Sequence, residues 1–482
     1  MNTQYHERNI SMVMDMYELT MSNGYLNQGF KDTWVVFDVF YRNNPDNGGF
    51  AIFAGLQQVV EYIENLHFSE EDVEYLRSKR LFTEEFLEYL LHFRFRGDIY
   101  AMKEGTVMYP NEPVMTVVAP LIDAQLIETT ILLEINHQSL IATKTNRIVQ
   151  AANGKPVSDF GARRAHNVDA AVYGARAAYI GGAAGTATVL AGKMFHIPIS
   201  GTMAHSWVMT FDSEYDAFKA YAESYPDGTV LLVDTYDVLK SGVPNAIRTA
   251  REVLEPMGKK LIGIRLDSGD LAYLSKEARK MLDEAGLPDC MIVASNSLDE
   301  YTISSLNRQG AKIDSYGVGE RLITSSSTPV FGAVYKLVAI QKDGKFIPRI
   351  KISETAEKIT NPGIKEVYRV YDENGKAVAD YLAVKGEQIR DFDPVRYVDP
   401  VNYWKNRSFV GCRFKKLQAP IFEKGKRIYD LPDIEEIRQY VKDQLENEIW
   451  EEEQRFENAH THYLDMSPAM FELKMSLLHE EN

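Results

Sequence analysis

Residues 195 to 208, FHIPISGTMAHSWV, combine a short β-branched run, a glycine, and a threonine followed by a histidine. The run from Ile197 to Ser200 is typical of a buried strand, and Gly201 permits a turn that displays Thr202 and His205 at its carboxyl end. A hydroxyl and an imidazole displayed there can contact a ligand. An isolated histidine is more often a hydrogen-bonded structural residue, so its surroundings must decide between the two interpretations.

Short apolar runs like this one recur along the middle of the chain, and helical patterns fill the gaps between them. The predicted strands are Val157–Gly161, Ile197–Gly201, Val230–Asp234, Leu261–Leu266, Met291–Ser295 and Ile313–Val318. This spacing predicts βα units around a parallel sheet. So many consecutive units favour closure into an irregular parallel α/β barrel, although periodicity alone does not separate a barrel from an open, doubly wound sheet.

The two ends of the chain have a different character. Residues 1–150 mix helical and strand-like patterns, including a first helix over 11–26 and one long helix over 123–152. We therefore predict an N-terminal α+β domain over residues 1–150 and the α/β barrel over 151–340. Residues 341–482 are expected to return to the N-terminal domain, with an acidic amphipathic helix over 433–455 that presents a solvated face.

Composition narrows the class of protein. The chain has 482 residues, of which 45% are hydrophobic and 25% are charged, and no apolar run is long enough to span a bilayer. The net charge of −16 argues against nucleic acid or an anionic membrane as the main partner. With only Cys290 and Cys412, no disulfide framework is expected, and MNTQYHERNI does not resemble a secretory signal. We expect a cytoplasmic enzyme.

Polar and glycine-rich segments follow the predicted strands directly. In chain order they are FGARRAHN, GTMAHSW, DTYD, RLDSGD, SNS and GVGERL. The carboxyl ends of parallel strands meet at one edge, where ligands bind in both barrels and open sheets. Any one segment has a structural explanation, since Asp267 or Asp299 could cap a helix and Arg163 could form a surface ion pair. Their common position nevertheless predicts a shared active site.

The residue types in these segments indicate the ligand. Guanidinium groups, which grip phosphate or carboxylate, come from Arg163, Arg164, Arg265 and Arg321. The turn at Gly317 and Gly319 allows backbone amides to approach a phosphate, and Asp267 and Asp270 could hold sugar hydroxyls or Mg²⁺. A phosphorylated sugar fits this mixture.

At this level of detail the chain resembles a known family. The segments MDMYELTMSNGY, FDVFYRNNP, DFGARRAHNVDAA, SGTMAHSW, IRLDSGDL and YGVGERLITSSSTPVFGAVYKL look like those of nicotinate phosphoribosyltransferases, in the same order, from about residue 10 to residue 340. The resemblance implies an α/β barrel plus an α+β domain built from both chain ends, as a homodimer with shared active sites. It also implies transfer of phosphoribose from phosphoribosyl pyrophosphate to nicotinate, with Mg²⁺ as cofactor and ATP as co-substrate.

The resemblance assigns roles to particular residues. His205 falls on the family's phosphorylated histidine and Thr202 on the threonine that contacts the nicotinate carboxylate, while Tyr17 and Phe160 match the aromatic pair that stacks on the pyridine ring. In this reading the histidine is the nucleophile towards ATP, whereas the displacement at ribose passes through an oxocarbenium-like state and needs no protein nucleophile.

Other positions match further ligand contacts of the family. They are Arg163, Arg265, Asp267, Gly317, Gly319 and Thr324. Asp267 is expected near the ribose as a catalytic carboxylate, and Asp267 with Asp270 would hold Mg²⁺. Related enzymes for nicotinamide carry an acidic residue near the position of Ala187, so its absence favours an anionic acid over an amide.

Two alternatives remain open from the sequence. One is an enzyme of the same framework that uses nicotinamide or quinolinate, although the chain length and the GTMAH segment argue against quinolinate. The other is a non-catalytic sensor of nicotinate or phosphoribosyl pyrophosphate. The presence of Tyr17, His205, Arg265 and Asp267 argues against a decayed site.

Overall fold

The computed structural model describes residues 8–355 and 358–480, and these divide into two compact units. The second unit runs from Lys144 to Pro329, and the first contains the chain on both sides of it. The boundaries differ from the predicted 150/151 and 340/341 for two reasons. The first boundary falls inside a continuous helix, α7 (Glu128–Ala151). The second boundary lies at 329/330 because the next strand, β12 (Val334–Lys342), pairs with β1 (Trp34–Phe40) of the first unit.

The second unit is built on a six-stranded, wholly parallel sheet in the order β7-β6-β11-β10-β9-β8. Its strands are β6 (Val157–Asp159), β7 (Gly185–Thr186), β8 (Val230–Leu232), β9 (Gly263–Leu266), β10 (Met291–Ala294) and β11 (Ser315–Val318). The predicted parallel α/β class is confirmed. Because β11 pairs with β6, the strand order is the cyclic order of a barrel.

The barrel prediction holds only in part, because the ring of hydrogen bonds is not complete within the described residues. The predicted strand Ile197–Gly201 is reduced to one parallel bridge between Ile199 and Thr186, and no strand ladder joins this segment to β8. The sheet is therefore open between Ile199 and β8.

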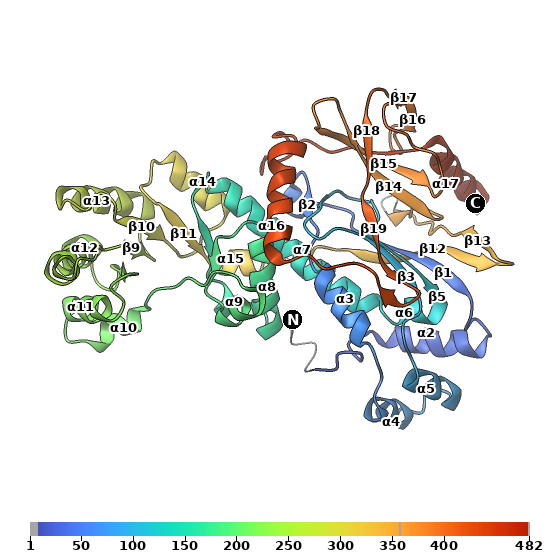
Figure 1. Ribbon diagram of the computed structural model, residues 1–482, viewed down its shortest axis with the longest axis horizontal. Coiled ribbons are helices and arrows are strands. Elements are labelled where there is room, and N and C mark those ends of the chain that lie inside the picture. The colour runs from blue at the N-terminus through green and yellow to red at the C-terminus, as the bar shows by residue number, and fades with distance from the viewer. Residues whose placement is uncertain (1–7, 356–357, 481–482) are drawn as a thin grey trace. The chain divides into compact units, whose positions relative to one another are not determined.

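Helices alternate with these strands along the chain (Figure 1). They include α8 (Val168–Ile180), α9 (Val189–Phe195), α10 (His205–Thr210), α11 (Glu214–Ser224), α12 (Val243–Thr249), α13 (Leu271–Glu284), α14 (Glu300–Arg308) and α15 (Glu320–Ile323). Several begin at side chains that accept a hydrogen bond from the first turn, namely Asn167, Ser213, Asp270 and Asp299. These caps fix where each connection ends and thus where the strand-end loops lie.

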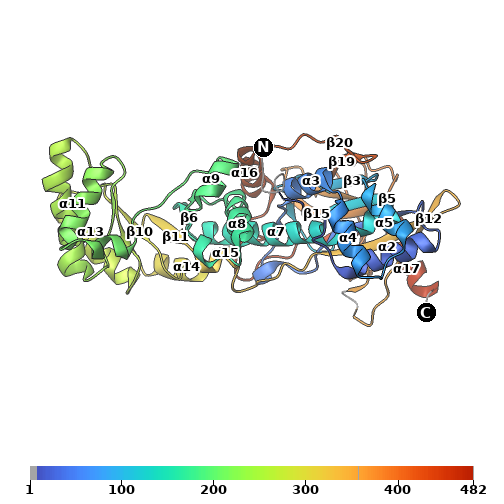
Figure 2. The ribbon, with the colours of Figure 1, turned by 90° about the horizontal axis from the view of Figure 1, so that it is seen from below.

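The first unit is organised around a seven-stranded antiparallel sheet in the order β13-β12-β1-β5-β3-β19-β20. Strands from before the second unit are β1 (Trp34–Phe40), β3 (Asp98–Met102) and β5 (Met115–Pro120); those from after it are β12 (Val334–Lys342), β13 (Lys345–Pro348), β19 (Gln418–Glu423) and β20 (Lys426–Arg427). The prediction that both chain ends build the α+β domain is confirmed (Figures 1 and 2).

A second six-stranded sheet of this unit comes entirely from the C-terminal segment. Its order is β17-β16-β21-β15-β14-β18, with β14 (Lys365–Tyr371), β15 (Ala377–Val384), β16 (Val395–Val398), β17 (Asn406–Phe409), β18 (Arg413–Lys416) and β21 (Leu464–Met466). A small ladder joins β2 (Ala51–Ile52) to β4 (Val107–Met108). One large apolar core is shared by the helices α2 (Met16–Asn27), α3 (Leu56–Asn65), α4 (Glu70–Ser78), α5 (Glu84–Leu91) and α17 (Pro468–Glu480) and by both sheets.

Three predicted helices are shorter than expected. The helix over 123–152 is broken into α6 (Leu121–Gln125) and α7, and the first helix begins at Met16 because Asp15 caps it. The acidic helix ends at Asp443 as α16 (Ile434–Asp443), continues as a π-helical turn to Glu448, and leaves helical geometry at Ile449. The prediction that this segment presents a solvated face is wrong at Glu453, whose side chain is buried. Across the described ranges, no helix combines the length and apolarity needed to cross a bilayer.

Candidate active site

The strand ends of the second unit bring several predicted site residues together. Arg265, on β9, donates from Nη1 to Thr202 Oγ1 at 2.6 Å and from Nη2 to the Met203 carbonyl at 3.1 Å. Thr202 and Met203 lie in the connection between Ile199 and α10, so this arginine spans the open edge of the sheet. The guanidinium thereby positions the threonine hydroxyl and the following turn.

His205 lies at the amino end of α10, a few residues beyond the strand end where it was predicted. Its Nδ1 lies 3.1 Å from Thr235 Oγ1, and its Nε2 lies 3.8 Å from Asp267 Oδ2 and 4.0 Å from Asp234 Oδ1. The imidazole is 40% exposed, so it is accessible to a ligand. One ring nitrogen therefore has a hydroxyl partner, and the other faces two carboxylates.

Asp234 is a functional candidate that the sequence analysis did not select. Its Oδ2 accepts from the Asp267 N–H at 2.8 Å and from the Ser268 hydroxyl at 2.7 Å, while the side chain is only 1% exposed. Its Oδ1 is buried and has no hydrogen-bond partner among the residues that the structure describes. The position of the segment DTYD directly after a predicted strand indicated that one of its residues could belong to the site. The sequence alone did not distinguish Asp234 from Asp237 for that role.

Asp267 is held from both sides. Its backbone N–H donates to Asp234, its Oδ1 accepts a short hydrogen bond from the Ser295 hydroxyl, and its Oδ2 faces His205.

Burial lowers the pKa of Arg265, with a smaller contribution from Arg163, against the opposing effect of Asp267. Arg163 is exposed and lies near enough to act on Arg265 through its charge.

Phe160 and the glycines after β11 form a second part of the strand-end region. The Phe160 N–H donates to the Val318 carbonyl at 2.8 Å, and a Cβ on Gly317 would lie 2.3 Å from the Phe160 ring. Gly319 is also close, since its Cβ would be 3.3 Å from the Phe160 carbonyl oxygen. Only glycine at 317 lets the ring occupy this position.

Some predicted site residues have structural partners. Asp270 caps α13 and accepts from the Tyr273 N–H at 3.0 Å. The Thr324 hydroxyl donates to the Glu320 carbonyl at 2.7 Å, and Arg321 pairs with Asp299, the cap of α14. These contacts do not test ligand binding. They show that the helix-capping alternative raised for Asp299 is correct, and that Asp270, for which no capping role was predicted, also caps a helix.

Tyr17 lies in the first unit, on α2, and is 42% exposed. Burial and the neighbouring Glu128 raise the pKa of its hydroxyl, so it is protonated. Its stacking with Phe160, which belongs to the second unit, stays a prediction.

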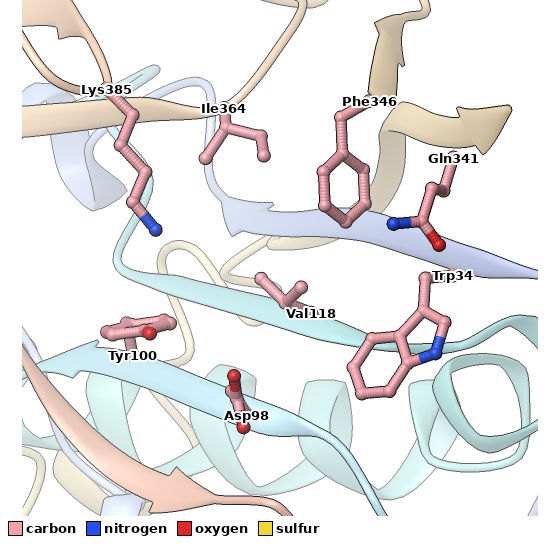
Figure 3. A pocket seen from close by; sticks show the side chains of 8 residues that line it. All are labelled: Trp34, Asp98, Tyr100, Val118, Gln341, Phe346, Ile364 and Lys385. Atoms are coloured by element: carbon pink, nitrogen blue, oxygen red, sulfur yellow. The ribbon is translucent and has the colours of Figure 1, made fainter. Parts of the chain in front are cut away.

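Elsewhere in the first unit, a pocket of about 360 Å³ on the seven-stranded sheet is lined by residues such as Trp34, Phe346 and Lys385 (Figure 3). It contains none of the predicted site residues.

Comparison with known proteins places this chain in a family. Three family models match the chain: the nicotinate phosphoribosyltransferase N-terminal domain over residues 12–136, the family itself over 156–373, and its C-terminal domain over 364–474. The nicotinate phosphoribosyltransferase of Bacillus subtilis (strain 168) is 47% identical over 477 residues, covering 99% of this chain and 96% of that protein. The chain belongs to the nicotinate phosphoribosyltransferase family.

Solved structures agree with this assignment. Human nicotinic acid phosphoribosyltransferase superposes with a TM-score of 0.86 at 27% identity, covering 96% of this chain and 99% of that one. A nicotinate-nucleotide pyrophosphorylase from Pyrococcus furiosus is similar with a TM-score of 0.69 at 26% identity, over 93% and 97% of the two chains. The resemblance read from the sequence is therefore confirmed, and the chain is an enzyme of the nicotinate phosphoribosyltransferase type.

Proposed function

We propose that this chain transfers the phosphoribosyl group of phosphoribosyl pyrophosphate to nicotinate and couples the transfer to hydrolysis of ATP through phosphorylation of His205. The products are nicotinate mononucleotide and pyrophosphate, together with ADP and phosphate. The observation that carries the proposal is the grouping of Arg265, Thr202, His205 and Asp267 at the strand ends. High identity to nicotinate phosphoribosyltransferases along nearly the whole chain supports it.

The transfer step requires charge stabilisation rather than a protein nucleophile. As pyrophosphate leaves the anomeric carbon, the ribose gains positive charge and the departing group carries negative charge. Asp267 supplies a carboxylate for the ribose, and the exposed Arg163 supplies a guanidinium for an anionic group. Thr202, held by Arg265, offers its hydroxyl proton to the nicotinate carboxylate, while the pyridine nitrogen attacks the anomeric carbon.

The ATP step uses His205 as the nucleophile. When Nδ1 carries the ring proton and donates it to Thr235, Nε2 keeps its lone pair for attack on the γ-phosphorus of ATP. The new N–P bond forms as the bond to ADP breaks, and water later hydrolyses the phosphohistidine. Asp234 and Asp267 face Nε2, where they favour the positive charge that the ring acquires on phosphorylation.

The same carboxylates fit the proposed magnesium cofactor. Mg²⁺ takes one or two carboxylates and keeps its remaining positions for water and substrate phosphates. The unpartnered Oδ1 of Asp234 and the Oδ2 of Asp267 provide such oxygens, whereas one oxygen of the predicted ligand Asp270 is already used to cap α13. Bound there, Mg²⁺ would neutralise phosphate charge that the two carboxylates otherwise repel.

The assembly and the location of the enzyme are also part of the proposal. A homodimer with shared active sites would let Tyr17 of the first unit meet a strand-end site, and the exposure of Tyr17 is compatible with such a role. A cytoplasmic location agrees with two cysteines, Cys290 and Cys412, that are both unpaired thiols.

Product analysis tests the proposal. Nicotinate, nicotinamide and quinolinate are each offered with phosphoribosyl pyrophosphate and Mg²⁺, with and without ATP, and the mononucleotides are separated by chromatography. We expect mononucleotide from nicotinate above all, formed faster when ATP is present. Preference for nicotinamide or quinolinate would reassign the substrate, and binding without any product in a single turnover would identify a sensor.

A further inference from the structure

The first unit contains a group of ionisable side chains that the proposed reaction does not use. Arg369 on β14 and Asp380 on β15 have side chains that are 1% and 0% exposed, and His462 and Glu453, from the segment before β21, are 1% and 3% exposed. Glu112, after β4, is completely buried. We refer to these five residues as the buried charge cluster. Ionisable groups are rarely enclosed in this way unless they are paired.

The contacts of His462 favour a charged ring, because a carboxylate lies beside each ring nitrogen. Its Nδ1 lies 3.1 Å from Glu453 Oε1, and its Nε2 lies 3.5 Å from Asp380 Oδ1. A neutral imidazole has one donor and one acceptor, so one of its nitrogens would present a lone pair to an ionised carboxylate. The Nε2 contact with Asp380 is at ion-pair distance and is not a hydrogen bond, and only the imidazolium places a proton instead of a lone pair on that side. The geometry therefore indicates that His462 is protonated in the folded protein.

The charges of the cluster balance only in that protonation state. Arg369 donates from Nε to Asp380 Oδ1 at 2.9 Å and from Nη2 to Oδ2 at 2.8 Å. Burial and the adjacent Asp380 carboxylate raise the pKa of Glu112 well above its ordinary value, so the neutral form of its carboxyl group is favoured. Two cations, Arg369 and His462, then face two anions, Asp380 and Glu453. Loss of the His462 proton would leave a buried negative charge without a partner, which is costly.

The cluster joins two segments that are far apart in the sequence. The Tyr109 ring stacks on His462 with centroids 3.7 Å apart, and its hydroxyl donates to Glu453 Oε2 at 2.6 Å. Arg369 Nη2 also donates to the Val107 carbonyl at 2.8 Å. The Asp380 N–H donates to the Tyr463 carbonyl at 2.8 Å. The loop 105–112 and the segment 449–466 thus contact each other through groups whose charges depend on one proton.

We propose that the buried charge cluster is an alkaline-sensitive latch, which holds the segment 449–466 against the loop 105–112 while His462 is protonated and releases it when that proton is lost. The groups that act on the imidazole are Asp380 from β15, Glu453 from its own segment, Asp465 from β21 and the stacked ring of Tyr109. Arg369 from β14 and Glu112 from the loop after β4 complete the charged surroundings through Asp380.

The direction of the pH effect follows from linkage. Burial alone would lower the pKa of His462, but Asp380 and Glu453 outweigh it, so this pKa lies above its ordinary value. A group with a raised pKa in the folded state stabilises fully below its unfolded pKa of about 6.5, and its contribution is lost as pH rises through the folded pKa. The latch therefore opens on the alkaline side.

Hydrogen–deuterium exchange of the full chain from about pH 6 to about pH 10, corrected for intrinsic exchange, measures this opening. We expect peptides from 449–466 to lose protection by at least about tenfold as pH rises, before peptides of β9 and β10 do. In His462→Gln, the same peptides should be exposed already at about pH 6 and should show no further alkaline step. The matched variant His460→Gln, at an exposed position two residues away, should behave as wild type.

A second variant guards against a His462→Gln chain that fails to fold. Glu453→Gln keeps an acceptor for Tyr109 but removes one of the charges that raise the pKa of His462, so the alkaline step should move to lower pH by about one unit. Protection in 449–466 that is independent of pH would overturn the proposal. So would simultaneous loss of protection in both units, or a step that is unmoved in Glu453→Gln.

Discussion

The 2.6 Å hydrogen bond from Arg265 Nη1 to Thr202 Oγ1 joins β9 to the connection that precedes α10. It crosses the side of the sheet where no strand ladder is present among the described residues. This side-chain hydrogen bond therefore connects two segments there, as backbone hydrogen bonds connect neighbouring strands elsewhere in the sheet. The residue expected to bind phosphoribosyl pyrophosphate therefore also places the residue expected to bind nicotinate. The two substrates should respond differently to changes at these two positions.

Arg265→Ala should raise KM for both substrates, because it removes a guanidinium and releases the Thr202 turn. Loss of a charge-assisted contact of this kind costs about 1.5 to 3 kcal/mol, or roughly ten- to more than a hundredfold in affinity. Thr202→Val keeps the shape but removes the hydroxyl, and should raise KM for nicotinate alone. Steady-state kinetics with each substrate varied in turn measures this. Unchanged parameters in Arg265→Ala would remove that residue from the site.

Asp234→Asn should separate folding from phosphorylation. The Asn oxygen can still accept from the Asp267 N–H and the Ser268 hydroxyl, so the melting temperature should change little. The charge facing His205 is lost, and we expect the rate of ATP-dependent phosphorylation to fall by at least about tenfold, equivalent to about 1.4 kcal/mol. An unchanged rate at normal stability would mean that the Asp234 charge is irrelevant.

Tyr17→Ala should weaken nicotinate binding much more than Tyr17→Phe does, because stacking depends on the ring and not on the hydroxyl. A loss of about 0.5 to 1.5 kcal/mol beyond that of simple burial is expected for the ring. Titration of nicotinate into each variant measures the difference. Equal losses in the two variants would show that the hydroxyl is the important group.

Glu18 gives a pH-dependent prediction for the first unit. Burial raises its pKa to about 7, despite hydrogen bonds from Thr129 and Asp15 that lower it. Its folded pKa is raised, so the folded state loses stability relative to the unfolded state as pH rises through about 7. Glu18→Gln, which cannot ionise, should therefore raise the melting temperature at about pH 8.5 more than at about pH 5. An equal shift at both values would contradict this account.

The sequence predicts the alternation of strands and helices well, because short apolar runs such as Val230–Leu232 are largely buried and are separated by helical patterns. It predicts barrel closure poorly. Whether Ile199 pairs with β8 depends on tertiary placement, which local periodicity does not specify. It also treats Glu453 as a surface residue, since burial of that carboxylate depends on Tyr109 and His462, which lie elsewhere in the chain.

The strand-end site shows the same division. Its location follows from glycine and polar residues after successive strands, which the parallel arrangement must bring to one edge. The roles within it do not follow. The sequence pattern does not distinguish Asp267 from Asp270, yet in the structure Asp267 faces His205 and Asp270 caps α13. Asp234 becomes a candidate only when its unpartnered oxygen is seen beside the histidine.

Phosphorylation of His205 is the most direct test of the account. Wild type, His205→Ala and the control His166→Ala, which changes another exposed histidine of the same unit, are incubated with Mg²⁺ and ATP labelled at the γ-phosphate. Wild type and His166→Ala should acquire an acid-labile, base-stable label that maps to residue 205. His205→Ala should acquire none, and should lose the stimulation by ATP while it keeps part of the ATP-independent transfer. Label retained in His205→Ala, or none in wild type, would contradict the assignment.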